Sequence, residues 1–316
     1  MTPVVTAGEP LGLLTPATRG RVGVGSSMTF SMAGSECNVA IALARLGIPV
    51  WFGGAVGNDP AGNAVIHTLR AEGVNVDLLN TNSHPTGLMM KEWFGLKPEP
   101  RVFYYCENTA MHAWEPPLML SPRLTTARLH LSGITLMIHS GLRERMLDWM
   151  KAWVEANRGG VSLDLNIRWR LGDATKWRET LQAAMASTDL IFASRSELMA
   201  LWDTDDSAQL NAQGILGTEQ VLVVTDGDRG AWAEQGGHHL GEVPAWPVGQ
   251  VTDVVGAGDG FAAGVLAGRI RGWSWPDSLK LGSIVGAFAV AHPGDWEGYP
   301  YWAEVAEILD GRWLER

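Results

Sequence analysis

The stretch DVVGAGDGFAAG, residues 253–264, combines glycines with two aspartates, Asp253 and Asp259, where a helix is expected to begin. Glycine permits positive φ angles and the close approach of an oxyanion. The free N–H groups at a helix N-terminus, aided by the helix dipole, bind anions without a basic side chain. An aspartate at the same place would repel an anion. The stretch therefore predicts a site where an anion and a proton acceptor must meet.

Three other glycine-rich motifs do not account for this stretch. A Walker A loop requires the dipeptide Gly-Lys, which occurs nowhere in the chain. A dinucleotide fingerprint requires glycine at position 261, which is Phe. The protein-kinase motifs are absent, as are the acyl-transfer elbow and the HExxH zinc motif.

Phosphoryl transfer fits both features of the stretch. Asp259 would take the proton from a hydroxyl as general base, while the amides of Gly256, Ala257 and Gly258 stabilise the transferring phosphoryl group. A bound Mg²⁺ would offset the repulsion between the carboxylate and the phosphates. A tight turn with an N-capping aspartate is the structural alternative.

The bulk composition is that of a soluble globular enzyme. The chain has 316 residues, of which 46% are hydrophobic and 18% charged, with a formal net charge of −10 and no Lys/Arg run. These values argue against nucleic acid as a partner. The N-terminus does not resemble a signal peptide, no apolar run is long enough to span a membrane, and Cys37 and Cys106 are too few for a disulfide framework. We expect a cytoplasmic protein.

Short β-rich runs alternate with helical patterns along most of the chain, which predicts βαβ units and a mainly parallel sheet. The predicted strands are 4–9, 50–57, 128–134, 160–166, 189–194 and 219–227, and the predicted helices are 38–47, 60–73, 141–157, 174–187, 194–203, 258–271 and 276–291. Residues 11–33 and 86–106 break this rhythm, and the second segment resembles a hairpin around Lys97–Pro100. The two segments either pair into a small separate sheet that serves as a lid, or are ordinary surface excursions.

Two signatures resemble those of the ribokinase-like (PfkB) sugar kinases. Residues 253–264 resemble the C-terminal signature D-T-x-G-A-G-D, and residues 33–65 resemble the N-terminal signature G-G-x-x-x-N-x-A with its following helix and turn. The resemblance covers essentially the whole chain. It implies one kinase domain over residues 1–316, a three-layer α/β/α fold with a mainly parallel central sheet, and a β-sheet lid formed by segments 11–33 and 86–106.

The resemblance also implies roles at the phosphate end. Asp259 matches the catalytic base, Gly256, Ala257 and Gly258 match the anion hole, and Asp253 matches a residue near a monovalent-cation region, where K⁺ is a possible ligand. The stretch VTDGDRGA, residues 224–231, resembles the nucleotide strand-turn-strand and implies an ATP site. The residues matched there are Thr225, Gly227 and Gly230.

The stretch SRSE, residues 194–197, occupies the place of the family's N-x-x-E motif. Glu197 is retained and would act on Mg²⁺ indirectly. Ser194 replaces the asparagine, so a plain helix N-cap by Ser194 is an equal alternative.

Within the family, several stretches resemble the 2-keto-3-deoxygluconate kinases, among them VVTAGEPLGLL (4–14) and DLNIRWRL (164–171). This implies that Arg168 grips an acid sugar's carboxylate, that Gly34 and Asn38 contact sugar oxygens, and that Tyr104 walls the pocket from the lid. The D-x-N-x-R pattern also occurs in relatives that use neutral sugars.

Two substrate-facing positions depart from the subgroup, because Met89 stands where Tyr is common and Cys106 where Arg is common. Arg168, with Lys91 as a further candidate, would then supply the positive charge for an acid. A kinase for fructose or ribose therefore stays an alternative, as does a non-catalytic sugar- or nucleotide-binding protein, while a dinucleotide-dependent oxidoreductase is the weakest interpretation. The expected partners are a small sugar and ATP, with self-association through the lid.

Overall fold

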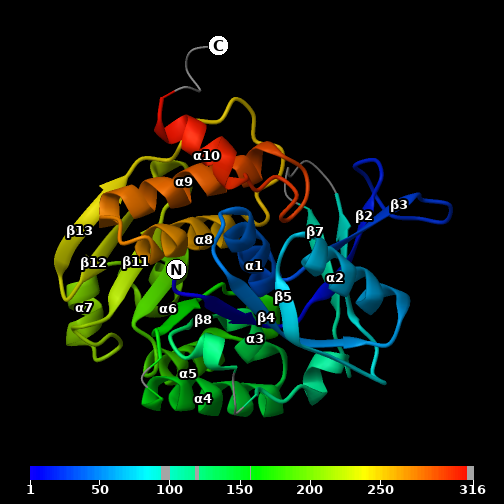
Figure 1. The fold of residues 1–316 in the computed structure, drawn as a ribbon, viewed down its shortest axis with the longest axis horizontal. Coiled ribbons are helices and arrows are strands. Elements are labelled where there is room, and N and C mark those ends of the chain that lie inside the picture. The colour runs from blue at the N-terminus through cyan, green and yellow to red at the C-terminus, as the bar shows by residue number, and fades with distance from the viewer. Residues whose placement is uncertain (94–99, 118–120, 157, 312–316) are drawn as a thin grey trace.

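The computed structural model describes residues 1–311 except 94–99, 118–120 and 157. A nine-stranded central sheet has the order β13-β12-β11-β10-β9-β8-β1-β4-β5 (Figure 1). The pairs β11–β12 and β12–β13 are antiparallel, whereas the other neighbours pair parallel. The strands are β1 Val4–Ala7, β4 Val50–Gly57, β5 Asn75–Asn82, β8 Arg128–Ser132, β9 Val161–Asp164, β10 Leu190–Ser194, β11 Val221–Thr225, β12 Ala231–Gln235 and β13 His238–Val243.

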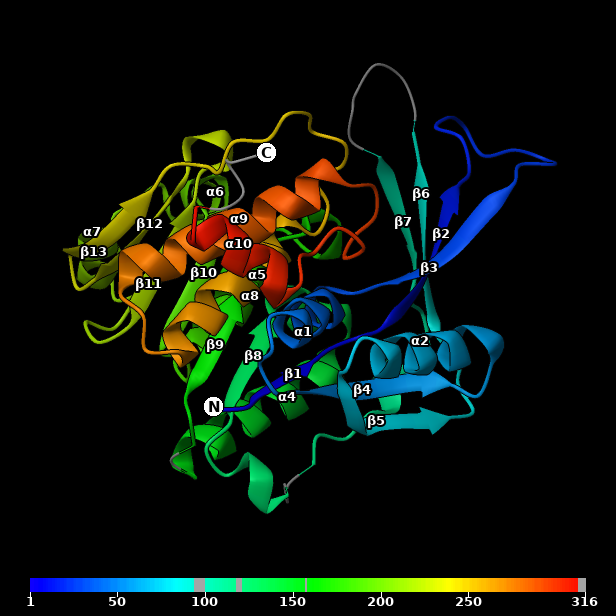
Figure 2. The same cartoon turned by 45° about the horizontal axis from the view of Figure 1, so that its top comes forward.

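Helices cover both faces of the central sheet (Figures 1 and 2). One buried apolar cluster joins the sheet to helices on one face, namely α1 Ser35–Arg45, α2 Pro60–Ala71, α8 Ala257–Ile270, α9 Trp275–Ala291 and α10 Trp302–Leu309. A second cluster joins it to α3 Gly133–Ile138, α4 Ser140–Glu155, α5 Ala174–Met185, α6 Arg195–Trp202 and α7 Ser207–Ala212 on the other face. The predicted three-layer α/β/α fold with a mainly parallel sheet is confirmed.

A separate four-stranded sheet, here called the small sheet, stands next to α2, on the side of the central sheet that ends with β4 and β5 (Figure 2). Its order is β3-β2-β6-β7, from β2 Leu11–Pro16, β3 Met28–Ala33, β6 Gly87–Glu92 and β7 Arg101–Tyr105. The two irregular sequence segments therefore pair with each other rather than forming separate excursions. The predicted tip of the hairpin at Lys97–Glu99 lies outside the described residues.

Several element boundaries differ from the predicted ones for local steric reasons. Strand β8 ends at Ser132 and α3 begins at Gly133, inside the predicted strand 128–134. A Cβ at Gly133 would lie 2.2 Å from the carbonyl oxygen of Leu165, so the chain turns where this close packing is possible. Strand β5 was not predicted, because it is a polar edge strand with a weak apolar pattern.

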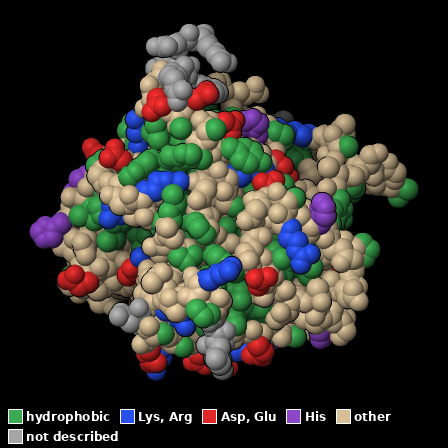
Figure 3. Space-filling view, in the orientation of Figure 1, with side chains coloured by type: hydrophobic (Ala, Val, Ile, Leu, Met, Phe, Trp, Pro, Cys, Tyr) green, Lys and Arg blue, Asp and Glu red, His purple; other side chains and the backbone are tan. Residues whose placement is uncertain are grey.

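No helix in the described part of the chain is long and apolar enough to cross a membrane. On the face seen in Figure 3, basic and acidic side chains are interspersed rather than gathered by sign.

Candidate active site

A cavity of about 890 Å³ opens between the small sheet, the carboxyl ends of central strands and the N-terminus of α8. Its walls come from segments far apart in sequence, including the start of α1, the loop after β9 and the end of β7. Ligands of open α/β sheets bind at this edge, outside the carboxyl ends of the strands. We therefore take this cavity as the candidate active site.

Residues 253–259, here called the anion turn, form the cavity wall at α8. Gly256 is the N-cap of α8 with φ +82°, a conformation that favours glycine. A Cβ at Gly256 would lie 1.8 Å from the carbonyl oxygen of Asp295, so no side chain fits there. Gly258 faces open space and lines the cavity. Among the described residues, the main-chain nitrogens of Gly256, Gly258 and Asp259 donate to no protein acceptor, which leaves them available to an anion.

Ala257 is placed differently from its two glycine neighbours. Its main-chain nitrogen makes a long bond to the carbonyl of Val254, 3.5 Å. Ala257 does not belong to the cavity lining, unlike Gly256 and Gly258.

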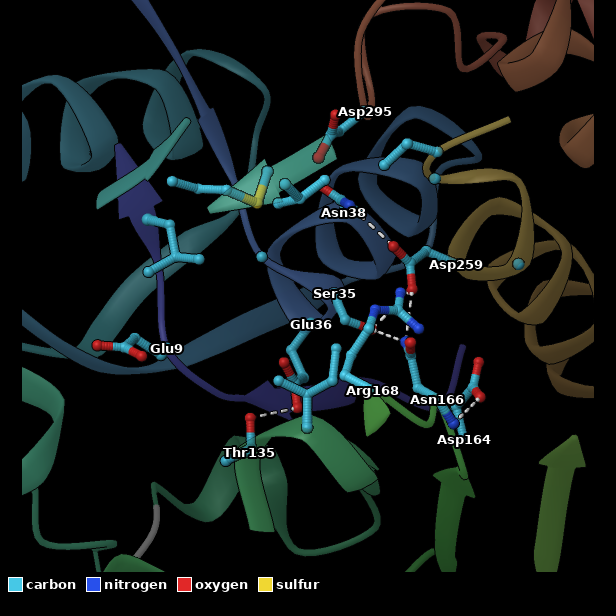
Figure 4. Close-up of a pocket in the computed structure, with 18 of the residues that line it drawn as sticks. Glu9, Ser35, Glu36, Asn38, Thr135, Asp164, Asn166, Arg168, Asp259 and Asp295 are labelled. Carbon is cyan, nitrogen blue, oxygen red and sulfur yellow. Dashed lines mark hydrogen bonds between the residues drawn. The ribbon is translucent and has the colours of Figure 1, made fainter. Parts of the chain in front are cut away.

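The carboxylate of Asp259 lies in the first turn of α8 and is 8% exposed (Figure 4). It accepts hydrogen bonds from Ser35 Oγ (2.7 Å) and Asn38 Nδ2 (2.8 Å), with Asn166 Nδ2 at 3.4 Å. Burial raises the pKa of Asp259 above its usual value, while the Ser35 and Asn38 bonds oppose that rise. These donors orient the carboxylate without neutralising it.

The loop after β9 carries the D-x-N-x-R pattern into the same cavity. Asp164 and Asn166 are largely buried, and the exposed Arg168 reaches past them toward Asp259 (Figure 4). The positive charge of Arg168 lowers the pKa of Asp164 and of Asp259, although burial leaves both raised. Arg170 also lines the cavity, and its guanidinium donates to the carbonyl of Val102 in β7 at 2.7 Å.

Glu197 lines the cavity from the first turn of α6, but its oxygens already have partners. They accept from the main-chain nitrogens of Ile167 (2.6 Å) and Ser194 (2.8 Å). Ser194 caps α6 in a capping box with Glu197, as the alternative interpretation of this motif predicted. Burial is the main cause of the raised pKa of Asp164, and the negative charge of Glu197 raises it further.

The residues predicted to bind the nucleotide are not all brought to the cavity. Thr225 lines it at the end of β11. Gly227 and Gly230 lie in the following turn with positive φ, outside the cavity lining. At Gly230 a Cβ would lie 2.1 Å from the carbonyl oxygen of Val243, so glycine is required there by packing against the end of β13.

The small sheet forms the opposite wall. Met89, Tyr104 and Cys106 line the cavity, and so do Gly34 and Asn38 at the start of α1. Gly34 has φ +130°, and a Cβ there would lie 2.7 Å from the carbonyl oxygen of Glu9.

Lys91, which the sequence offered as a second cation for an acid sugar, does not belong to the cavity lining. Its ammonium lies 2.5 Å from Asp295 Oδ1 and 3.2 Å from Asp253 Oδ2, and the side chain is 1% exposed. That expectation is wrong, because the ammonium is buried and already paired with two carboxylates.

Several polar residues of the cavity were given no role from the sequence, among them Ser35, Asn166, Glu36 and Glu9. Ser35 and Asn166 lie within the quoted motifs, and that position was the available signal. Glu36 accepts from Ser132 Oγ and Thr135 Oγ1, both at 2.7 Å, and burial raises its pKa to about 7. Glu9 accepts from Thr109 Oγ1, and burial raises its pKa to about 7 as well.

Comparisons with known proteins agree with this architecture. The chain matches the model of the pfkB family carbohydrate kinases over residues 3–301. It is 29% identical to 2-dehydro-3-deoxygluconokinase of Bacillus subtilis (strain 168), over 98% of this chain and 95% of that protein. It is 32% identical to fructokinase of Klebsiella pneumoniae, over 85% of this chain and 88% of that protein. The structure of a PfkB protein from Polaromonas sp. JS666 superposes with a TM-score of 0.83 at 27% identity, covering 97% and 99% of the two chains. The chain therefore belongs to the pfkB family of carbohydrate kinases, as its two signatures predicted, and is a sugar kinase.

Proposed function

We propose that this kinase transfers the γ-phosphoryl group of ATP to the 6-hydroxyl of 2-keto-3-deoxygluconate, with Asp259 as general base. The observation that carries the proposal is the buried carboxylate of Asp259, fixed by Ser35 and Asn38 beside the main-chain N–H groups of the anion turn. A proton acceptor and an anion site meet there, as phosphoryl transfer requires.

The proposed step is a single in-line displacement. Asp259 takes the proton from the sugar hydroxyl while that oxygen forms a bond to the γ-phosphorus. The bond from the γ-phosphorus to the bridging oxygen breaks, and ADP leaves with the electron pair. The N–H groups of Gly256, Gly258 and Asp259 stabilise negative charge on the transferring group. The pKa of Asp259, raised by burial, makes the carboxylate a better proton acceptor than an ordinary aspartate.

The residues around Asp164 fit a Mg²⁺ ion carried by the nucleotide. Asp164 and Glu197 are oxygen donors, which Mg²⁺ prefers, and they lie close enough that the charge of Glu197 raises the pKa of Asp164. No cluster of three or more His, Cys, Asp or Glu side chains in the described ranges is arranged to hold a metal by itself. A Mg²⁺ here would therefore take most of its ligands from phosphates and water, and it would neutralise charge on the phosphates. A structural neighbour, a putative ribokinase from E. coli, is titled as a complex with ATP and Mg²⁺.

Arg168 supports an acid sugar as the substrate, because its exposed guanidinium lies in the cavity and can grip a carboxylate through two bonds. The relative from Bacillus subtilis, named 2-dehydro-3-deoxygluconokinase, supports the same choice. The small sheet would close over the sugar and exclude water that otherwise hydrolyses ATP.

A neutral sugar is the second candidate, favoured by the small-sheet wall. Met89 and Cys106 supply no positive charge there, and Glu9 adds a carboxyl group. A relative at 32% identity is named fructokinase.

One assay separates these candidates. ADP release is measured with 2-keto-3-deoxygluconate, its galactonate epimer, fructose and ribose in turn. We expect the highest kcat/KM with 2-keto-3-deoxygluconate. A preference for fructose or ribose would replace the acid by a neutral sugar, and no ADP release with any sugar would remove the catalytic proposal for this site.

A further inference from the structure

A buried cluster of three charges includes Asp253, the first residue of the anion turn. The ammonium of Lys91, from β6 of the small sheet, bonds to Asp295 Oδ1 (2.5 Å) and Asp253 Oδ2 (3.2 Å). The side chains are 1%, 3% and 5% exposed respectively. The three residues come from the small sheet, the start of the anion turn and the loop after α9, so this cluster joins segments far apart in the sequence.

Both acidic residues contact the turn that would hold phosphate, Asp253 through its carboxylate and Asp295 through its main chain. Asp253 Oδ1 accepts from the main-chain nitrogen of Val255 at 3.1 Å. Gly256 packs so closely on the Asp295 main chain that a Cβ there would lie 1.8 Å from the Asp295 carbonyl oxygen. The hydroxyl of Tyr299, in the same loop as Asp295, donates to the Gly256 carbonyl at 2.7 Å. The positions of Asp253 and Asp295 therefore set the position of the N–H groups on Gly256 and Gly258.

The cluster depends on its cation. Two carboxylates this deeply buried repel one another, and an unpaired buried charge is costly. Burial raises the pKa of Asp295 to about 6, and the positive charge of Lys91 opposes that rise. The two carboxylates in turn raise the pKa of Lys91 against the effect of burial, which keeps the ammonium charged.

The same strand also carries part of the sugar wall. Side chains two residues apart in a strand point to the same face. Met89 lines the cavity, and Lys91 is the next residue of β6 on that buried face. A displacement of β6 by a bound sugar would therefore move the ammonium that holds the anion turn.

We propose that Lys91 is a positioning residue whose ammonium acts as a built-in cation, holding the anion turn in its phosphate-binding form and linking it to the small sheet. The inference rests on the proposed role of the anion turn. It assigns the neighbourhood of Asp253 to a tethered cation instead of the free monovalent ion that the family resemblance led us to expect.

The first test uses the unmodified chain. ADP release is measured with its best sugar while KCl is exchanged for tetramethylammonium chloride at constant ionic strength and constant Mg²⁺. We expect kcat to change less than about twofold, because the Lys91 ammonium already supplies the positive charge between the two carboxylates. A requirement for K⁺ or ammonium would overturn the inference.

The second test uses Lys91→Ala, with propylammonium or ammonium as a replacement for the missing group. We expect kcat to fall on the order of 100-fold, similar to the loss of one oxyanion-hole donor, with little change in the KM for ATP. Propylammonium should restore part of kcat and raise the melting temperature, since a ligand that binds the folded state stabilises it. Tetramethylammonium, too large for the vacated space, should do neither.

Two further variants make the result specific. Lys91→Met fills the space with an apolar chain, so it should lose kcat without rescue by any cation. Arg128→Met removes an ion pair to Asp189 (2.7 Å) at the start of β8 and should leave kcat unchanged. If Lys91→Ala does not fold, Lys91→Met combined with Asp295→Asn removes the ammonium and one carboxylate together, so that Asp253 alone remains charged, and it should fold with a low kcat.

Retention of kcat by either Lys91 variant, or a loss in Lys91→Ala that no small cation relieves, would assign Lys91 a structural role only and overturn the inference. A failure of the proposed function would look different, because the unmodified chain would then release no ADP with any sugar.

Discussion

The two walls of the cavity present different chemical groups to it. At the α8 wall, the polar groups that face the cavity are main-chain N–H groups and the carboxylate of Asp259, which accepts hydrogen bonds from Ser35 and Asn38. At the small-sheet wall, they are side chains, among them Met89, Tyr104 and Cys106. A main-chain site tolerates few substitutions, because its geometry depends on glycines that no other residue can replace. A side-chain wall can change its chemistry one residue at a time, so the reaction is easier to infer from this chain than the substrate.

The strongest test of this difference between the walls is to remove the proton acceptor, Asp259, from the α8 wall. In Asp259→Asn, the new side chain can still accept from Asn38, so we expect normal folding with kcat lower by roughly 10²–10⁴-fold. The KM for ATP should change little. Steady-state ADP release and thermal unfolding give the two readings.

The matched control is Asp277→Asn, which changes a carboxylate in the first turn of α9 that bonds Ser274. It should keep its kcat. In the unmodified chain, kcat/KM should fall as the pH drops through the pKa of Asp259, which burial raises above 3.8. A kcat near normal in Asp259→Asn would remove this residue from the mechanism.

The anion turn itself can be tested with two glycines that differ in their surroundings. Gly256→Ala places a Cβ against the Asp295 carbonyl at φ +82°, so we expect a loss of at least about 2 kcal/mol in the free energy of unfolding, together with lost activity. Gly258→Ala meets nothing within 4 Å, so its stability should stay within about 1 kcal/mol. Its methyl group enters the proposed phosphate site and should lower kcat on the order of 10²-fold. Urea unfolding and ADP release separate the two effects, and full activity of Gly258→Ala would show that phosphate does not bind there.

The sequence predicted the parts of the site that are contiguous in the chain. The anion turn and Asp259 lie within one short motif, and the alternation of strands and helices predicted the three layers. The partners of Asp259 were harder to find, because Ser35 is 224 residues away and no local pattern shows that the two side chains meet. Lys91 was misjudged for the same reason, since Asp295, its partner, is 204 residues distant. The first pair is determined by how α1 packs beside α8, and the second by how the small sheet packs on the central part of the chain.

The variant Arg168→Ala tests which sugar the small-sheet wall and the neighbouring loop after β9 recognise. We expect the KM for 2-keto-3-deoxygluconate to rise about 10–100-fold, the effect of losing charge-assisted bonds to a carboxylate, and the KM for fructose to change little. Arg170→Ala is the comparison variant, because the Arg170 guanidinium is partly engaged by the Val102 carbonyl. Equal effects of Arg168→Ala on acid and neutral sugars would show that Arg168 does not recognise the carboxylate.

The smallest expected effect concerns the pH dependence of stability. The buried carboxyl groups of Glu36 and Glu9 should make the folded chain less stable as the pH rises. Glu36 has a folded-state pKa of about 7 against 4.5 for an ordinary glutamate, and Glu9 shows the same rise. Between these values the folded chain binds more protons than the unfolded chain, so the free energy of unfolding falls as the pH rises from about 4.5 to about 7. Each group contributes at most roughly 3 kcal/mol to that fall. Glu36→Gln keeps an oxygen that accepts from Ser132 and Thr135 but has no proton to lose, so urea unfolding at pH 5 and pH 7.5 should show a smaller difference than in the unmodified chain. An unchanged difference would mean that Glu36 is ionised in the folded state at both pH values, stabilised by the hydroxyl groups around it.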